Sequence, residues 1–219
     1  MSARTAARRD PTERRDELLD AALRVATRHG LVGLSPAGVA QESGRSKALV
    51  FHYFGSTDGL RRAVARVAID DLDAQVHAPE DVPAAQRPAL VARRFLDAVT
   101  GRAPVWRDVW RGTLAADAET AAALEAVRRA LVERMARAAS DAGFDPSPRA
   151  ATLARGWVAL VETVTAQWLD QDGPGPLGRA DVESLAVQSL AVLVPEVPAD
   201  LGRRLTAVAR AAARPDASR

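Results

Sequence analysis

Helix-start signals recur along this chain of 219 residues and constrain its fold more than any other feature. Asp10-Pro11 and Ser35-Pro36 each join a capping side chain to a proline, which suits the first helical position. Gly30 and Gly44 then end the two helices that these pairs open. No stretch combines alternating apolar and polar residues with β-branched enrichment, so the sequence predicts an all-α protein.

The expected helices form a short N-terminal set and a longer C-terminal set. The first set covers about 10–29, 35–43, 46–54 and 58–74. Further helices are expected near 84–101, 104–115, 118–142, 147–171 and 179–194, with 199–213 as an additional candidate. Asp117 and Asp145-Pro146 are start signals in this region, and the glycine- and proline-rich segment 173–176 is the clearest loop.

Composition excludes several classes of protein. The chain has no cysteine, which removes disulfides, cysteine-ligated zinc, iron–sulfur clusters and thiol nucleophiles. Its three histidines are far apart, and no nucleophile–base pair or phosphate-binding loop is visible, so we expect no enzyme, metal or cofactor. There is no apolar run of about 18 residues. Arg8-Arg9 is followed by charge rather than by an apolar stretch, so we expect a cytoplasmic protein without a signal peptide.

The formal net charge of +2 is unevenly distributed. Residues 1–66 carry 12 basic and 7 acidic side chains, whereas residues 67–219 carry 18 basic and 21 acidic ones. A basic N-terminal module on a mildly acidic body indicates a polyanionic partner at one end of the protein.

The segment between Ser35 and Phe54 has the pattern of a helix-turn-helix. Two short helices flank a tight turn at Gly44, where a β-carbon would be unfavourable. The second helix is expected to expose Arg45, Lys47, Ala48, His52 and Tyr53, which suit the base edges and phosphates of a major groove. Ser46, at its start, adds backbone amides that suit a phosphate. A bare pattern of this kind also fits an ordinary corner between helices, with His52 on the surface and Tyr53 packed.

The N-terminal region resembles the DNA-binding domain of TetR-family transcriptional regulators. The resemblance rests on Arg15-Asp-Glu-Leu-Leu-Asp-Ala-Ala through Gly30, Val39-Ala40, Gly44, Ser46-Lys-Ala-Leu-Val-Phe-His-Tyr-Phe54 and Leu60. It implies a homodimer that binds a palindromic operator, and a divergent C-terminal domain that takes a small effector. It also implies a regulator that is more often a repressor.

Two positions depart from the family pattern. Phe51 stands where the family usually has Tyr, and Thr57 stands where it usually has Lys; both usual residues can contact phosphate. The Phe51 ring can still touch a thymine methyl, and Arg61 or Arg62 can replace the missing charge. The candidate DNA-binding residues are therefore Ser35, Arg45, Ser46, Lys47, Ala48, Phe51, His52, Tyr53, Thr57 and Arg61.

The expected organisation has three parts. Residues 1–9 form a disordered basic arm, whose Arg4, Arg8 and Arg9 either enter a minor groove or remain solvated. Residues 10–57 form the three-helix DNA-binding domain, and residues 58–219 form a larger helical domain for effector binding and dimerisation. By resemblance, the helices near 147–171 and 179–194 pair with their counterparts in a four-helix bundle; an intramolecular core is the alternative.

The aromatic residues of the body suggest an effector pocket. Trp106 and Trp110 lie one turn apart, and another expected helix carries an apolar stripe with polar residues beside it. Because ligand sites are mostly apolar with a few polar groups, we expect an apolar effector. The few aromatic residues and scattered acids fit a hydrophobic or cationic molecule better than an acidic one. The candidate effector-binding residues are Phe95, Trp106, Trp110, Met135, Trp157, Val161, Glu162 and Gln167. The alternative is that these residues are simply core.

Two other functions remain open from the sequence alone. The Phe51 and Thr57 departures allow an all-α protein-interaction or ligand-sensing module that has lost specific DNA binding. An enzyme is disfavoured, because no catalytic constellation is visible.

Overall fold

The computed structural model describes residues 10–79, 81–83, 86–112, 114–141, 147–171 and 175–193. These residues form nine α-helices and no strand. Their order along the chain is α1 Pro11–His29, α2 Pro36–Ser43, α3 Lys47–Phe54, α4 Thr57–Gln75, α5 Arg87–Gly101, α6 Ala103–Arg111, α7 Ala118–Asp141, α8 Pro148–Leu169 and α9 Arg179–Leu193. The all-α prediction is confirmed.

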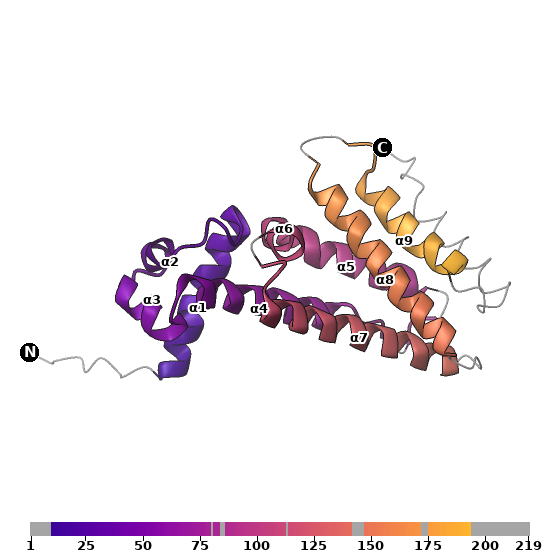
Figure 1. The fold of residues 1–219 in the computed structure, drawn as a ribbon, viewed down its shortest axis with the longest axis horizontal. Helices are drawn as coiled ribbons and strands as arrows, with labels where there is room; N and C mark the ends of the chain where they lie inside the picture. Colours follow the sequence, from indigo (N-terminus) through magenta and orange to yellow (C-terminus); the bar gives the residue numbers. More distant parts are fainter. Residues whose placement is uncertain are drawn as a thin grey trace, which may run out of the picture.

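Helices α1, α2 and α3 form a head at one end of the molecule (Figure 1). Their starts follow the predicted capping logic. The Asp10 carboxylate accepts the Thr12 amide at 3.1 Å, and the Ser35 hydroxyl accepts the Gly38 amide at 3.1 Å. Gly44 ends α2 in the left-handed conformation, with φ 65° and ψ 26°. Glycine adopts this conformation without steric cost because it has no β-carbon.

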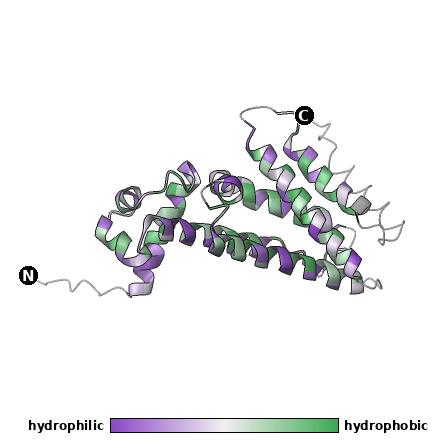
Figure 2. Ribbon diagram, in the orientation of Figure 1, coloured by the Kyte–Doolittle hydropathy of each residue, from purple (hydrophilic) through white to green (hydrophobic). Residues whose placement is uncertain are grey.

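Helix α4 leaves the head and joins it to the body, which consists of α5 to α9. Within the body, α4 lies along α7 (Figure 1). Helices α5 and α6 contact α4 as well, while α8 and α9 pack together on the far side of the body. Figure 2 shows hydrophobic positions along α4 and α7, where the two helices lie side by side. The head is thus connected to the body both through α4 and through α6, which contacts α1.

Two apolar cores hold these helices together. The larger one joins the head to the near part of the body, since Leu18 and Val50 share it with Leu72 and Trp106. The smaller one lies under α8 and α9 and includes Trp157. Burial of such side chains contributes about 1.5–3 kcal/mol each, so the head and the near body are stabilised as one unit.

Most helix limits follow the prediction, with two clear differences. α5 begins at Arg87 rather than near 84, and α6 ends at Arg111 rather than near 115 because Gly112 adopts an extended conformation. α8 is capped by Ser147, whose hydroxyl accepts the Ala150 amide at 3.1 Å. The start signal expected at 145–146 and the candidate helix at 199–213 lie outside the described residues, as does the arm 1–9.

Candidate nucleic-acid interface and effector cavity

One face of α3 presents exposed side chains at the tip of the head. Lys47, Ala48, Phe51 and His52 are exposed, whereas Val50 and Phe54 are buried on the opposite side. The Ser46 hydroxyl accepts the Leu49 amide at 3.2 Å and so fixes the start of the helix. A single helix presented this way matches the width of a major groove.

The exposed face combines cationic and aromatic groups. The Lys47 ammonium lies 5.7 Å from the centre of the Phe51 ring, and His52 meets Tyr53 edge to face at 5.1 Å. Phe51 is 39% exposed, which is unusual for a large apolar side chain. The ring is therefore available to a partner surface, while the half-buried Tyr53 packs against the core.

Arg45 lies at the turn of the motif and pairs within the head. One of its terminal nitrogens is 2.7 Å from the Glu17 carboxylate on α1. Ser35 is exposed and caps α2, and Thr57 is half-buried as the first residue of α4. The structure thus places Arg45 in a contact that also orients α1 against the turn.

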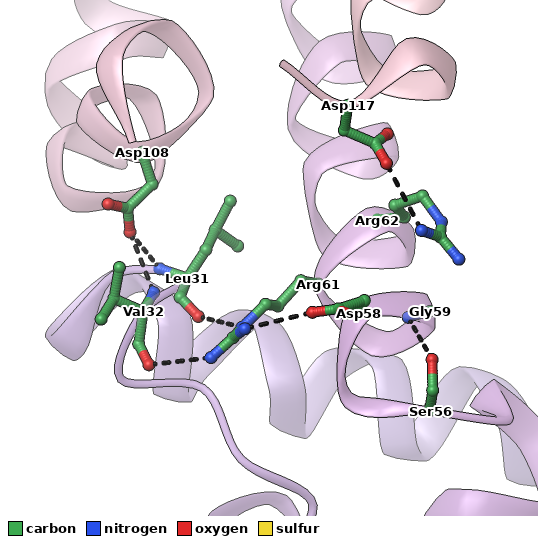
Figure 3. Close-up of polar contacts among 9 residues, drawn as sticks. All are labelled: Leu31, Val32, Ser56, Asp58, Gly59, Arg61, Arg62, Asp108 and Asp117. Carbon is green, nitrogen blue, oxygen red and sulfur yellow. Dashed lines mark hydrogen bonds and ion pairs between the residues drawn. The ribbon is translucent and has the colours of Figure 1, made fainter. Parts of the chain in front are cut away.

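Arg61 and Arg62, which the sequence offers as replacements for the charge missing at Thr57, both contact groups within the protein. The Arg61 guanidinium donates to the carbonyl oxygens of Leu31 and Val32 at 2.9 and 3.2 Å (Figure 3). Arg62 lies 3.4 Å from Asp117, so it joins α4 to the start of α7. Both guanidinium groups thus have partners within the protein, and their contact with phosphate stays a prediction.

The loop between α1 and α2 is held from both sides (Figure 3). The Asp108 carboxylate of α6 accepts the amides of Leu31 and Val32 at 2.5 and 3.1 Å, while Arg61 binds the carbonyls of the same two residues. Sequence reasoning missed Asp108, because the two partners are 76 and 77 positions away and no local pattern marks the contact. The loop therefore links the head directly to α4 and α6.

A cavity lies inside the body, bounded by α4, α5, α7, α8 and α9. Its volume is about 40 Å³. Eleven of its lining residues are apolar, and two are charged. The lining residues are Leu72, Val76, Val91, Ala92, Phe95, Val127, Arg128, Leu131, Trp157, Val158, Val161, Glu162 and Ala186. The mostly apolar lining with two polar groups matches that of small-molecule sites, whereas the volume is well below the roughly 300–1,000 Å³ of such sites. An occupant larger than water therefore requires side chains of the lining to move.

The two charged residues of the cavity form a forked ion pair. The Arg128 guanidinium meets both Glu162 carboxylate oxygens, at 2.7, 3.0 and 3.1 Å. Desolvation raises the pKa of the Glu162 carboxyl above its ordinary value, although the hydrogen bonds and charge of Arg128 oppose this. Burial lowers the pKa of Arg128, but the contacts with Glu162 outweigh it and the pKa rises. Glu162 is thus a carboxylate held in an apolar setting by one cation.

The structure brings together half of the predicted effector residues. Phe95, Trp157, Val161 and Glu162 line the cavity. The Trp157 indole donates to the Ala186 carbonyl at 2.9 Å, which fixes its ring. No local pattern marks Arg128, which reaches Glu162 across 34 positions.

The other predicted effector residues lie elsewhere. Trp106 is buried in the larger core, and the Trp110 ring lies beside it, tilted by 40° with the ring centres 5.0 Å apart. Met135 packs against the smaller core, and Gln167 is exposed. Trp110 also lies 6.3 Å from the Phe95 ring, so it packs behind a residue that lines the cavity, whereas Gln167 lies on the exposed face of α8.

The described part of the chain offers no cluster of three or more His, Asp or Glu side chains that could hold a metal ion. Among the same residues, no helix has the length and hydropathy needed to cross a membrane.

The fold and the two sites define a class: an all-helical protein with a helix-turn-helix head on a helical body that encloses a cavity. Comparison with family models agrees with this class. Residues 18–64 match the model of bacterial regulatory proteins of the tetR family, and residues 85–194 match the tetracyclin repressor-like C-terminal domain. The chain belongs to the tetR family of regulatory proteins.

Individual relatives support the same assignment. The chain is 40% identical over 104 residues to the HTH-type transcriptional regulator BetI of Burkholderia mallei, a match that covers 44% of this chain and 53% of that protein. The chain therefore aligns with about half the length of these curated relatives. A tetR-family regulator from Streptomyces coelicolor superposes with a TM-score of 0.76 at 28% identity, covering 93% of this chain and 90% of the other.

A second solved structure is a multidrug binding protein, EbrR, in complex with imidazole. It matches with a TM-score of 0.55 at 26% identity, covering 87% of this chain and 98% of that one.

Proposed function

We propose that the protein is a ligand-responsive transcriptional regulator that binds a palindromic operator as a homodimer and represses transcription. The observation that carries the proposal is the exposed face of α3, with Lys47, Phe51 and His52 presented beyond a helix-turn-helix. Lys and His donate to base edges, and an apolar ring suits the thymine methyl group. The excess of basic residues in 1–66 adds sequence-independent attraction to phosphates.

Homodimerisation is proposed through α8 and α9. These helices contact each other at the far side of the body, and Leu153, Leu160, Val164 and Leu185 on them are only partly buried within one chain. Burying these side chains against a second copy would recover apolar contact area. A dimer would also hold two copies of α3 at the spacing of two half-sites, about 34–36 Å apart per helical turn.

The effector is proposed to occupy the cavity of the body. Leu72 and Val76 belong to the far end of α4 and its cap, and both line the cavity. The near end of α4 carries Arg61 and Arg62, which contact the head loop and α7. A molecule that displaced the far end of α4 would therefore move the head, and the distance between the two copies of α3 would change.

The proposal also includes a cytoplasmic location and the absence of catalysis, both consistent with regulation of transcription. A protein-interaction module without specific DNA binding is the second candidate. It is favoured by the exposed apolar ring of Phe51 and by the engagement of Arg61 and Arg62 within the protein.

Selection of genomic DNA fragments, followed by footprinting, tests the proposal. The wild type should recover a palindromic site, and its affinity should fall steeply as salt rises, because binding releases counterions. Lys47→Ala should weaken binding and change the sequence preference. Arg129→Ala removes a positive charge from an exposed position on α7 and is the matched control. It should change neither the affinity for DNA nor the sequence preference.

Two outcomes would count against regulation through α3. If Lys47→Ala binds every sequence as the wild type does, α3 does not read the DNA. If no specific fragment is recovered from the genome, the interaction-module candidate is preferred.

A further inference from the structure

We infer that the cavity of the body is a site for an apolar molecule with one positive charge, such as a hydrocarbon-substituted amine or quaternary ammonium ion. The inference deepens the proposed function, on which it depends for its regulatory meaning, by assigning the charge of the effector. It follows from an asymmetry between the two members of the Arg128–Glu162 pair.

Glu162 is the more deeply buried member of the pair. Its side chain is 14% exposed, whereas that of Arg128 is 34% exposed. Among the ion pairs of the described residues, Glu162 takes part only in the one with Arg128. Removing Arg128 without replacing its charge would leave a buried carboxylate uncompensated, which is strongly unfavourable.

Arg128 has a second acidic partner outside the cavity. Glu125 lies one turn earlier on α7, is 57% exposed, and has a carboxylate oxygen 3.6 Å from the Arg128 guanidinium. Arg128 can therefore rotate away from Glu162 and keep an ion pair at the surface, where solvent also stabilises its charge. Its departure would enlarge the cavity by the space that its side chain now fills.

These two facts distinguish a cationic occupant from an anionic one. A cation can take the position of the guanidinium beside Glu162 while Arg128 moves to Glu125, so every charge keeps a partner. An anion would have to take Arg128 from Glu162 and lie beside a buried carboxylate, which combines repulsion with the loss of the only counter-charge.

The walls of the cavity favour the same class of occupant. Phe95 and Trp157 both line it, and aromatic ring faces attract cations more strongly when water is excluded. The hydrogen bond from Trp157 to Ala186 holds that ring in place before anything binds. The remaining lining residues are aliphatic and suit the hydrocarbon part of the molecule.

Three probes of similar size and different charge test the assignment on the whole chain. Benzyltrimethylammonium is the cation, neopentylbenzene is its neutral isostere, and 3-phenylpropanoate is the anion. Binding is measured by calorimetry and by the fluorescence of Trp157 and the other tryptophans, without DNA. We expect the cation to bind at least about tenfold more tightly than either of the others, as the cost of an uncompensated buried charge requires.

Variants locate the charge that is responsible. Glu162→Gln should weaken binding of the cation at least about tenfold, and Arg128→Met should strengthen it, because the competing guanidinium is gone. Glu133→Gln removes a negative charge from an exposed position on the same helix as Glu125 and should change nothing. Circular dichroism establishes that each variant is folded.

The inference is overturned if the anion binds most tightly, if Glu162→Gln binds the cation as the wild type does, or if the cation fails to bind at millimolar concentration. These outcomes are separate from the fate of the proposed function. Selective cation binding by a protein that recovers no specific DNA would contradict regulation of transcription and support the assignment of the cavity. Specific DNA binding with preference for the anion would contradict only the assignment.

Discussion

The carboxylate of Asp108 accepts the backbone amide of Leu31 at 2.5 Å, and so fastens α6 to the loop that precedes α2. The same carboxylate accepts the Val32 amide at 3.1 Å, while Arg61 binds the two carbonyls from the opposite side (Figure 3). The four polar groups of this loop segment are thereby satisfied by α4 and α6. The loop thus connects the head to the body, because a movement of α4 or α6 would change its hydrogen bonds.

Removal of this carboxylate should destabilise the protein. Asp108→Ala leaves the Leu31 and Val32 amides without their acceptor, so we expect a loss of about 1–3 kcal/mol in the free energy of unfolding. Urea denaturation measures this loss. Asp97→Ala, which removes an exposed carboxylate from α5, is the control and should cost less. Equal stability of the Asp108→Ala variant and the wild type would show that the contact contributes nothing.

Gly30, directly before this loop, should tolerate no side chain. Its φ of 71° and ψ of −179° belong to a region that is almost restricted to glycine, and an added β-carbon would lie 2.7 Å from the Asp108 carboxylate. Gly44→Ala is disfavoured only by the left-handed backbone conformation, because no atom lies within 4 Å of the added β-carbon. We therefore expect Gly30→Ala to cost more than the roughly 1–2 kcal/mol of Gly44→Ala.

Thermal or urea unfolding of the two variants gives this order directly. Gly101→Ala is a useful third member, because nothing lies within 4 Å of its added carbon either and its φ is not in the left-handed region. It should leave stability almost unchanged. A smaller loss for Gly30→Ala than for Gly44→Ala would contradict the role assigned to the loop.

The sequence predicted the helices of the head well, because local chemistry decides them. Asp10, Ser35 and Ser46 lie next to the amides that they cap, and Gly44 supplies a conformation that other residues avoid. The end of α6 was predicted too late, since Gly112 interrupts a run whose composition still suits a helix.

The sites were less predictable, because they depend on contacts between distant parts of the chain. The outward face of α3 was predictable, because helical periodicity places Val50 and Phe54 on the opposite, buried side. Arg128 and Asp108 meet their partners across 34 and 77 positions, and nothing nearby distinguishes them from other charged residues on helices. Trp106 lies outside the cavity and is buried in the larger core, and helical spacing alone does not distinguish these two positions for an aromatic residue.

Restoring the hydroxyl at the exposed ring of α3 should strengthen DNA binding. Phe51 stands on the surface proposed to enter the major groove, and its ring is 39% exposed. Phe51→Tyr adds a donor that can reach phosphate, worth about 0.5–1.5 kcal/mol, or up to about tenfold in affinity. Gel-shift titration on the selected operator measures this gain. Phe54→Tyr, on the buried side of α3, is the control and should not improve binding. A weaker complex for Phe51→Tyr would indicate that the ring makes an apolar contact with a base.

The stability of the protein should fall with rising pH through the titration of Glu162. Desolvation raises the pKa of this carboxyl in the folded protein above its ordinary value of 4.5, so the folded state holds its proton more tightly than the unfolded state does. The contribution of Glu162 to the free energy of unfolding is therefore fully present below pH 4.5, and it is lost as the pH rises through the raised pKa. Glu162→Gln carries no titrating proton and should lack this dependence.

Urea unfolding of the wild type and Glu162→Gln at a series of pH values from 4.5 upward isolates the effect. The free energy of unfolding of Glu162→Gln should increase relative to that of the wild type as pH rises. The difference should then become constant, because the other groups titrate alike in both proteins. Glu133→Gln, which changes an exposed carboxyl on α7, should show no such trend relative to the wild type. A difference that moves in favour of the wild type would mean that Arg128 outweighs desolvation and lowers the pKa of Glu162.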